Sequence, residues 1–137
     1  RFIKAELVPA INKKFRTNTA NNSIIGHSFG GLFVFYCLFK NESVFRHYYA
    51  LSPSLWINKY GIYQFNKLAE ESSTAAHTLY FSVGGLEVIN FIKPGADKMK
   101  SFFDRKCYKN LQYQYQVHEG ESHNSQVEKS LERIFSE

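Results

Sequence analysis

The chain has 137 residues, 44% of them hydrophobic and 17% aromatic, which is enough for one domain with a buried core. Its net charge is +5, and the basic residues are scattered with no nucleic-acid-binding motif beside them. Two cysteines are too few for a disulfide scaffold or a cysteine-based metal site. The longest apolar run, Leu32 to Phe39, is too short to cross a bilayer. We therefore expect one globular domain without a nucleic-acid partner or a membrane span. We also expect no metal and no cofactor. The composition does not decide between a cytoplasmic, a periplasmic and a secreted protein.

The first predicted element is an amphipathic helix, because apolar residues recur every four positions at Ile3, Leu7, Ile11 and Phe15. Pro9 lies inside this stripe and predicts a kink or a late helix start. A polar, turn-forming segment follows over residues 17–22. Ser23 to Gly26 then reads as a short strand, and Phe29 to about Lys40 as a helix that is apolar on most sides and therefore buried.

The second half of the chain repeats the alternation of strands and helices. Tyr48 to Leu51, Thr78 to Val83 and Leu111 to Val117 are predicted strands. Helices are predicted over Trp56 to Glu71 and, after a loop through Pro94 and Gly95, from about Ala96 to Tyr108.

The chain closes with a helix that a capping box of Ser125 and Glu128 is expected to start. Its predicted inward-facing residues are Val127, Leu131, Ile134 and Phe135.

This alternation predicts an α/β fold with about four parallel strands and helices on both faces of the sheet. Parallel strands end at one common edge, where function gathers in such folds. The loops that start at His27, Ser52, Gly84 and His118 are therefore expected to share that edge.

The string Gly26-His27-Ser28-Phe29-Gly30 lies between a predicted strand and a predicted helix. That context is typical of the tight turn that presents a nucleophilic serine at the edge of an α/β sheet. The glycines suit such a turn because strand and helix approach closely there. Ser28 is therefore the predicted nucleophile, and a purely structural turn is the alternative.

A nucleophilic serine needs a histidine to accept its proton, and in this architecture the base follows the acid along the chain. His123 is the favoured base because it lies in a polar loop just ahead of the last helix. His118, at the end of the last strand, is the other candidate. His27 flanks Ser28 and is expected to pack or hydrogen-bond beneath the turn.

The predicted acid is Glu87, in the loop that leaves the carboxyl end of the third strand. Asp97 is the rival, although it is expected at a helix N-cap. The backbone N–H of Phe29 follows the nucleophile, opens a helix and is the predicted first oxyanion donor.

Four segments resemble the esterase D-like branch of the α/β-hydrolases, which includes the enterochelin-type siderophore esterases; they are residues 26–33 (GHSFGGLF), 52–56 (SPSLW), 82–87 (SVGGLE) and 120–125 (GESHNS). The resemblance implies Ser28 as nucleophile, His123 as base and Glu87 as acid. It also implies that Trp56 lines the substrate pocket, with a core tryptophan as the alternative. No metal or cofactor is implied.

The resemblance also implies that residues 1–137 are one partial α/β-hydrolase domain, its C-terminal part, with the first strands and the second oxyanion loop missing. We expect a serine esterase that forms an acyl-enzyme, acting on a siderophore-type lactone or another small ester. An acyltransferase of the same branch and a non-catalytic interaction domain are the alternatives. The fragment alone is expected to be a weak catalyst or none, and to self-associate near Ile24 and Phe33, because the strand at Ser23 to Gly26 would lie at a sheet edge.

Overall fold

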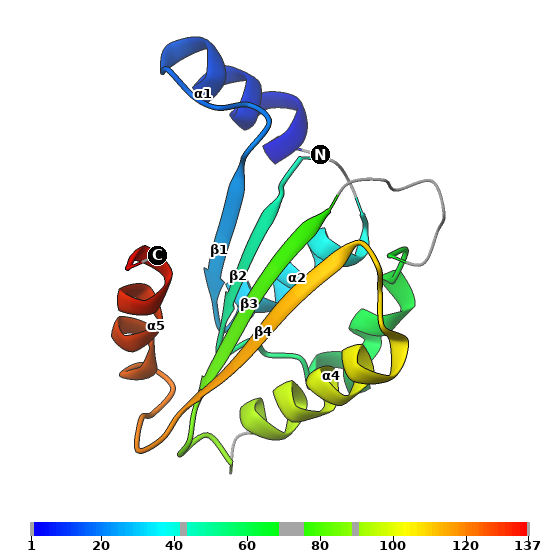
Figure 1. Cartoon of the computed structure of the whole chain (residues 1–137), viewed down its shortest axis with the longest axis vertical. Coiled ribbons are helices and arrows are strands. Elements are labelled where there is room, and N and C mark those ends of the chain that lie inside the picture. The colour runs from blue at the N-terminus through cyan, green and yellow to red at the C-terminus, as the bar shows by residue number, and fades with distance from the viewer. Residues whose placement is uncertain (1, 42–43, 69–75, 89–90, 137) are drawn as a thin grey trace.

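A computed structural model describes residues 2–41, 44–68, 76–88 and 91–136. Its centre is a parallel sheet with the strand order β1-β2-β3-β4, and all four strands run in the same direction (Figure 1). The strands are β1 (Ser23–His27), β2 (His47–Leu51), β3 (His77–Gly84) and β4 (Leu111–His118). The four strands predicted from the sequence are all present.

Helices cover both faces of this sheet, so the predicted α/β class is confirmed (Figure 1). Those of the described residues are η1 (Ile3–Leu7, a π-helical turn), α1 (Val8–Lys14), α2 (Phe29–Phe39), α3 (Ile57–Tyr60), η2 (Gly61–Phe65, a 3-10 turn), α4 (Ile92–Lys106) and α5 (Gln126–Phe135). The α2 and α4 helices pack on one face of the sheet and α5 on the other. The side chains of β3 show this, because neighbouring residues of a strand point to opposite faces. Phe81 contacts Phe35 and Phe103, whereas Ser82 bonds to Gln126 and Ser130.

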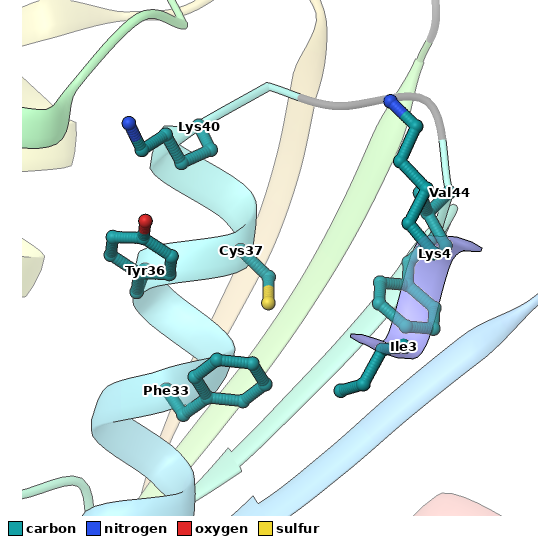
Figure 2. Close-up of a pocket in the computed structure, with 8 residues that line it drawn as sticks. Ile3, Lys4, Phe33, Tyr36, Cys37, Lys40 and Val44 are labelled. Atoms are coloured by element: carbon teal, nitrogen blue, oxygen red, sulfur yellow. The ribbon is translucent and has the colours of Figure 1, made fainter. Parts of the chain in front are cut away.

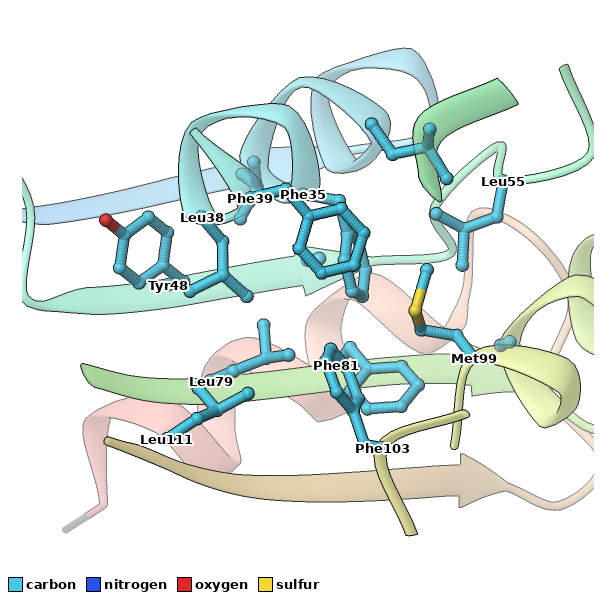
Figure 3. Close-up of a cluster of buried hydrophobic side chains, with 14 of the residues drawn as sticks. Phe35, Leu38, Phe39, Tyr48, Leu55, Leu79, Phe81, Met99, Phe103 and Leu111 are labelled. Atoms are coloured by element: carbon cyan, nitrogen blue, oxygen red, sulfur yellow. The ribbon is translucent and has the colours of Figure 1, made fainter. Parts of the chain in front are cut away.

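The hydrophobic core lies between α2, α4 and the sheet (Figure 3). Aromatic rings dominate it: Phe35 and Phe39 of α2 and Phe103 of α4 pack edge-on or stacked, with ring centroids 6.1 to 6.3 Å apart. Aromatic pairs of this kind add to the free energy gained by burying their area. These phenylalanines therefore stabilise the packing of α2 and α4 on the sheet.

The helix predicted over Trp56 to Glu71 is wrong. The structure has a four-residue helix, α3, followed by the 3-10 turn η2, and Asn66 is extended. Asn58, Lys59 and Tyr60 have left-handed backbone angles, which interrupt a continuous α-helix. Residues 69–71 of the predicted helix lie outside the described residues.

The loop predicted through Pro94 and Gly95 is also wrong, because α4 already begins at Ile92. Proline is tolerated in the first turn of a helix, where its missing N–H would have no intrahelical partner. Asp97 consequently lies in the helix interior and not at the predicted N-cap.

The predicted capping box does not form at the start of α5. Ser125 occupies the cap position, but its hydroxyl accepts from the N–H of Ser122 instead of the helix. The predicted inner face is confirmed only in part: Val127, Leu131 and Ile134 are half-buried, but Phe135 is 79% exposed. The fully buried residues of α5 are Gln126 and Ser130, which the prediction did not include.

The amino-terminal helical segment is present, with Pro9 at the start of α1. None of its residues is buried, and Leu7, Ile11 and Phe15 are exposed. The β1 strand is at the sheet edge and its Ile25 is also exposed. Over the described ranges, no helix is long and apolar enough to cross a membrane.

Candidate active site

Ser28 occupies the tight turn between β1 and α2. Its backbone has φ 59° and ψ −115°, a region of backbone angles that residues other than glycine rarely adopt. The turn is anchored to the neighbouring strand, because the Ser28 N–H donates to the Leu51 carbonyl at 2.9 Å. The Ser28 carbonyl accepts from the N–H groups of Leu32 and Ser54, both at 3.1 Å.

Gly26 is required by close packing in this turn. A Cβ at Gly26 would lie 2.3 Å from the Gly30 carbonyl oxygen, which is far inside contact distance. The same expectation for Gly30 is wrong, because a Cβ there would meet nothing within 4 Å. The close approach of β1 and α2 therefore excludes a side chain at Gly26 but not at Gly30.

Glu87 is buried at the carboxyl end of β3, with 2% of its surface exposed. Its Oε2 accepts two hydrogen bonds of 2.7 Å, one from the Ser52 hydroxyl and one from the backbone N–H of Gly84. Its Oε1 contacts Nδ1 of His123. Hydrogen-bond donors on both oxygens orient the carboxylate in a single position.

His123 lies in the loop between β4 and α5, on the same edge of the sheet. Its Nδ1 is engaged by Glu87, which leaves Nε2 as the ring atom that can act on a substrate or a nucleophile. His27 packs beside it: the ring centroids are 4.5 Å apart and His27 Nε2 is 2.9 Å from the His123 carbonyl oxygen. His27 thus holds the backbone of the His123 loop.

The structure brings Glu87 and His123 into direct contact and places both at the strand ends where Ser28 lies. The Ser28 hydroxyl is 3.4 Å from the Ser54 hydroxyl. Within the described part of the chain it forms no hydrogen bond with the His123 ring. Such bonds are often long or misaligned before a substrate is bound.

The two rival residues have other partners. His118 Nε2 lies 3.1 Å from the Ser130 hydroxyl and 3.2 Å from the Tyr80 hydroxyl, on the α5 face of the sheet. Asp97 accepts from the Tyr115 hydroxyl at 2.8 Å and pairs with Lys93 at 2.9 Å. The carboxylate in contact with His123 is that of Glu87.

Phe29 and Trp56 flank this edge of the sheet. Phe29 is the first residue of α2, and the first N–H groups of a helix have no intrahelical partner. Its side chain is 65% exposed. Trp56 directly precedes α3 and is 40% exposed, so it is not a core tryptophan.

Three contributors had no role in the prediction: Ser52, Ser54 and the imidazole of His27 as a partner of His123. Ser52 and Ser54 belong to a segment quoted for the family resemblance, which was the available signal. Their side-chain contacts depend on the placement of β2 beside β1 and β3, and local sequence does not specify that placement.

Two pockets lie along α2. One, of about 130 Å³, separates η1 from α2 and contains no predicted site residue (Figure 2). Figure 2 labels Ile3, Lys4, Phe33, Tyr36, Cys37, Lys40 and Val44 around it. The other, of about 350 Å³, lies between α2 and the α3–η2 segment and is mostly apolar. Phe29 is part of its lining, so this second pocket begins next to Ser28.

Comparison with known proteins identifies the family, because the sequence profile of the Esterase family matches residues 1–132. The chain belongs to the Esterase family. Two similar relatives are the ferri-bacillibactin esterase BesA of Bacillus subtilis, 41% identical over 59 residues, and the siderophore triacetylfusarinine C esterase of Aspergillus fumigatus, 34% identical over 77 residues. These matches cover 43% and 56% of the chain, but only 20% and 26% of the relatives.

Solved structures agree with this assignment. The BES protein from Bacillus cereus superposes on 96% of the chain with a TM-score of 0.87 at 29% identity. The siderophore hydrolase EstB from Aspergillus nidulans superposes on 98% with a TM-score of 0.83 at 25% identity. The chain spans 50% and 54% of those two proteins. The resemblance to the siderophore-esterase branch of the α/β-hydrolases is confirmed.

Proposed function

We propose that this chain carries the catalytic residues of a serine esterase that cleaves carboxylic esters through an acyl-enzyme. Ser28 is the nucleophile, His123 the general base and Glu87 the acid that orients it. The observation that carries the proposal is the buried Glu87 carboxylate, which contacts Nδ1 of His123 at the edge of the sheet where Ser28 has a positive φ.

The proposed reaction begins with attack of the Ser28 Oγ on the ester carbonyl, while His123 Nε2 takes the hydroxyl proton. The imidazolium that forms is stabilised by Glu87 and returns the proton to the leaving alcohol. Water then enters and attacks the acyl carbonyl while His123 takes its proton. The bond to Ser28 breaks, His123 returns that proton to Ser28 Oγ, and the carboxylic acid is released. Glu87 fixes the tautomer, because its contact with Nδ1 keeps the proton there and leaves Nε2 as acceptor.

Charge develops on the carbonyl oxygen during the attack, and the Phe29 N–H is the proposed donor to it. Phe29 directly follows Ser28 and opens α2, so its N–H lies at the positive end of the helix dipole. Loss of one such donor typically costs about 2.7–4 kcal/mol of transition-state stabilisation.

The proposed substrate is a small ester of the siderophore type. Three comparisons support this class, because the names of the two relatives describe siderophore esterases and EstB is a siderophore hydrolase of the same fold. The apolar pocket that begins at Phe29 offers space for an apolar part of the ester. Trp56 is not among its lining residues but directly precedes one of them, Ile57, and remains the proposed pocket residue. The observations favour hydrolysis over acyl transfer, since the named relatives are esterases and hydrolases.

The test is the Ser28→Ala variant of the full-length protein, assayed with a p-nitrophenyl ester and a fluorophosphonate probe. We expect turnover to fall by several orders of magnitude and labelling to disappear, as for other serine nucleophiles. Ser101→Ala is the matched control, because that exposed hydroxyl bonds only within α4. Hydrolysis by Ser28→Ala at the wild-type rate would place the activity elsewhere.

A further inference from the structure

Five polar side chains form a continuous hydrogen-bonded group between the sheet and α5, which we call the α5 cluster: Tyr80, Ser82, His118, Gln126 and Ser130. Gln126 Oε1 accepts from the hydroxyls of Ser82 at 3.0 Å and Ser130 at 2.7 Å, and those hydroxyls are 2.8 Å apart. The Ser130 hydroxyl also lies 3.1 Å from His118 Nε2, which is 3.2 Å from the Tyr80 hydroxyl.

Stability alone does not account for this cluster. Ser82, Gln126 and Ser130 are fully buried, although α5 carries the apolar residues Val127 and Leu131 that burial would favour. A buried polar group is unfavourable unless it is hydrogen-bonded, and Gln126 Nε2 is buried without a partner in the described part of the chain. The helix thus buries two polar side chains more deeply than its own half-buried apolar residues, which points to a role in placement.

The cluster fixes both ends of the loop that carries His123. His118 is the last residue of β4 and Gln126 the first of α5, so the loop runs from one cluster member to another. At its start, the Glu121 N–H donates to the His118 carbonyl at 3.2 Å. At its end, the Gln126 N–H donates to the Ser122 carbonyl at 3.2 Å.

The same cluster is connected to Glu87 through Ser82. The Ser82 carbonyl accepts from the N–H of Ser52 at 2.8 Å, and the Ser52 hydroxyl donates to Glu87 Oε2. Two residues after Ser82, the Gly84 N–H donates to the same carboxylate oxygen. Both donors that orient Glu87 are therefore attached to this part of β3.

We propose that the α5 cluster is a positioning device that sets the distance and angle between His123 and Glu87. Ser82, Gln126 and Ser130 are its positioning residues, and their polar contacts fix the rotation of α5 on the sheet, which an apolar contact would leave less specific. The proposal rests on the assigned roles of His123 and Glu87. A misplacement of a reacting group by about 1 Å can lower the rate about 100-fold.

The test is the triple variant Ser82→Ala/Gln126→Met/Ser130→Ala of the full-length protein. Replacing all partners of a buried polar group by apolar groups of similar shape changes stability little. We therefore expect thermal unfolding close to that of the wild type, with kcat for p-nitrophenyl acetate about 10- to 100-fold lower and KM nearly unchanged. The far-downfield proton resonance of the His123 Nδ1–H is expected to broaden or vanish.

Tyr48→Phe is the matched control. It removes a buried hydroxyl that donates to the Phe45 carbonyl at 3.1 Å, on the other face of the sheet. We expect this variant to keep kcat and the downfield resonance.

An unchanged kcat and an unchanged resonance in the triple variant would overturn the proposal. If the triple variant does not fold, Ser130→Ala alone decides by the same two measurements. A wild-type protein without ester turnover would refute the proposed function, and the resonance would still decide whether the cluster positions His123.

Discussion

Glu87 contacts His123 through one carboxylate oxygen, and its other oxygen accepts hydrogen bonds from the Ser52 hydroxyl and the Gly84 N–H. The two oxygens are therefore not equivalent: Oε2 accepts two hydrogen bonds from fixed donors, and Oε1 faces the imidazole. This asymmetry predicts how the amide of a Glu87→Gln variant would be oriented.

Glu87→Gln is expected to lower kcat by roughly 10⁴-fold, as the analogous acid-to-amide change does in serine proteases. Ser52 and Gly84 would donate to the amide oxygen, so the amide NH₂ would face His123 Nδ1. The imidazole proton would then move to Nε2, the atom that must be unprotonated to accept the proton of Ser28. The measurement is kcat with a p-nitrophenyl ester. Asp97→Asn is the control and is expected to retain wild-type kcat; loss of activity in Asp97→Asn alone would assign the acid to Asp97.

Gly26→Ala is expected to destabilise the protein by about 1–3 kcal/mol, because its Cβ would lie 2.3 Å from the Gly30 carbonyl oxygen. Gly30→Ala is the matched control, since its Cβ would meet nothing within 4 Å and alanine favours a helix by roughly 0.5–1 kcal/mol. Urea unfolding of both variants compares the two positions. Equal stabilities would contradict the close approach at Gly26.

Self-association is the expected behaviour of residues 1–137 expressed alone. The β1 strand is at the edge of the sheet with Ile25 exposed, and Phe33 of α2 is 42% exposed. Unpaired strand edges and apolar surface favour association. Analytical ultracentrifugation measures the assembly, and Ile25→Lys should reduce it. A monomer at high concentration would rule this expectation out.

The free energy of unfolding is expected to fall as the pH drops below about 6.5. Burial lowers the pKa of His77 and His118 from their ordinary value of 6.5, with Arg46 lowering the pKa of His77 further. Near His118, Lys129 acts in the same direction and Glu121 opposes it. Because the unfolded chain then binds more protons than the folded one, stability is complete above 6.5 and is lost below it.

Denaturant unfolding between about pH 5 and 8 measures this dependence. His77→Gln should flatten the profile, because it removes one of the two groups with a lowered pKa. A profile with the same slope in His77→Gln and the wild type would show that His77 does not contribute.

The sequence alone determined the α/β class and the sheet edge at which the candidate site residues lie, because both follow from local patterns. Alternating strands and helices make the sheet parallel, so the ends that carry Ser28, Glu87 and His123 must lie on one side. The need for glycine at position 26, two residues before Ser28, likewise follows from the tight turn. Such features depend on few neighbouring residues, which is why pattern is enough to predict them.

Only the tertiary structure decided which side chains meet. Glu87 contacts His123. Asp97 contacts Tyr115 instead, because α4 begins before Pro94 and Asp97 is therefore a residue in the middle of that helix. The α5 helix buries Gln126 and Ser130 more deeply than its half-buried apolar residues, since Ser82 and His118 of two separate strands offer them hydrogen bonds. Contacts between residues far apart in the chain depend on how strands and helices pack, and no local periodicity encodes that packing.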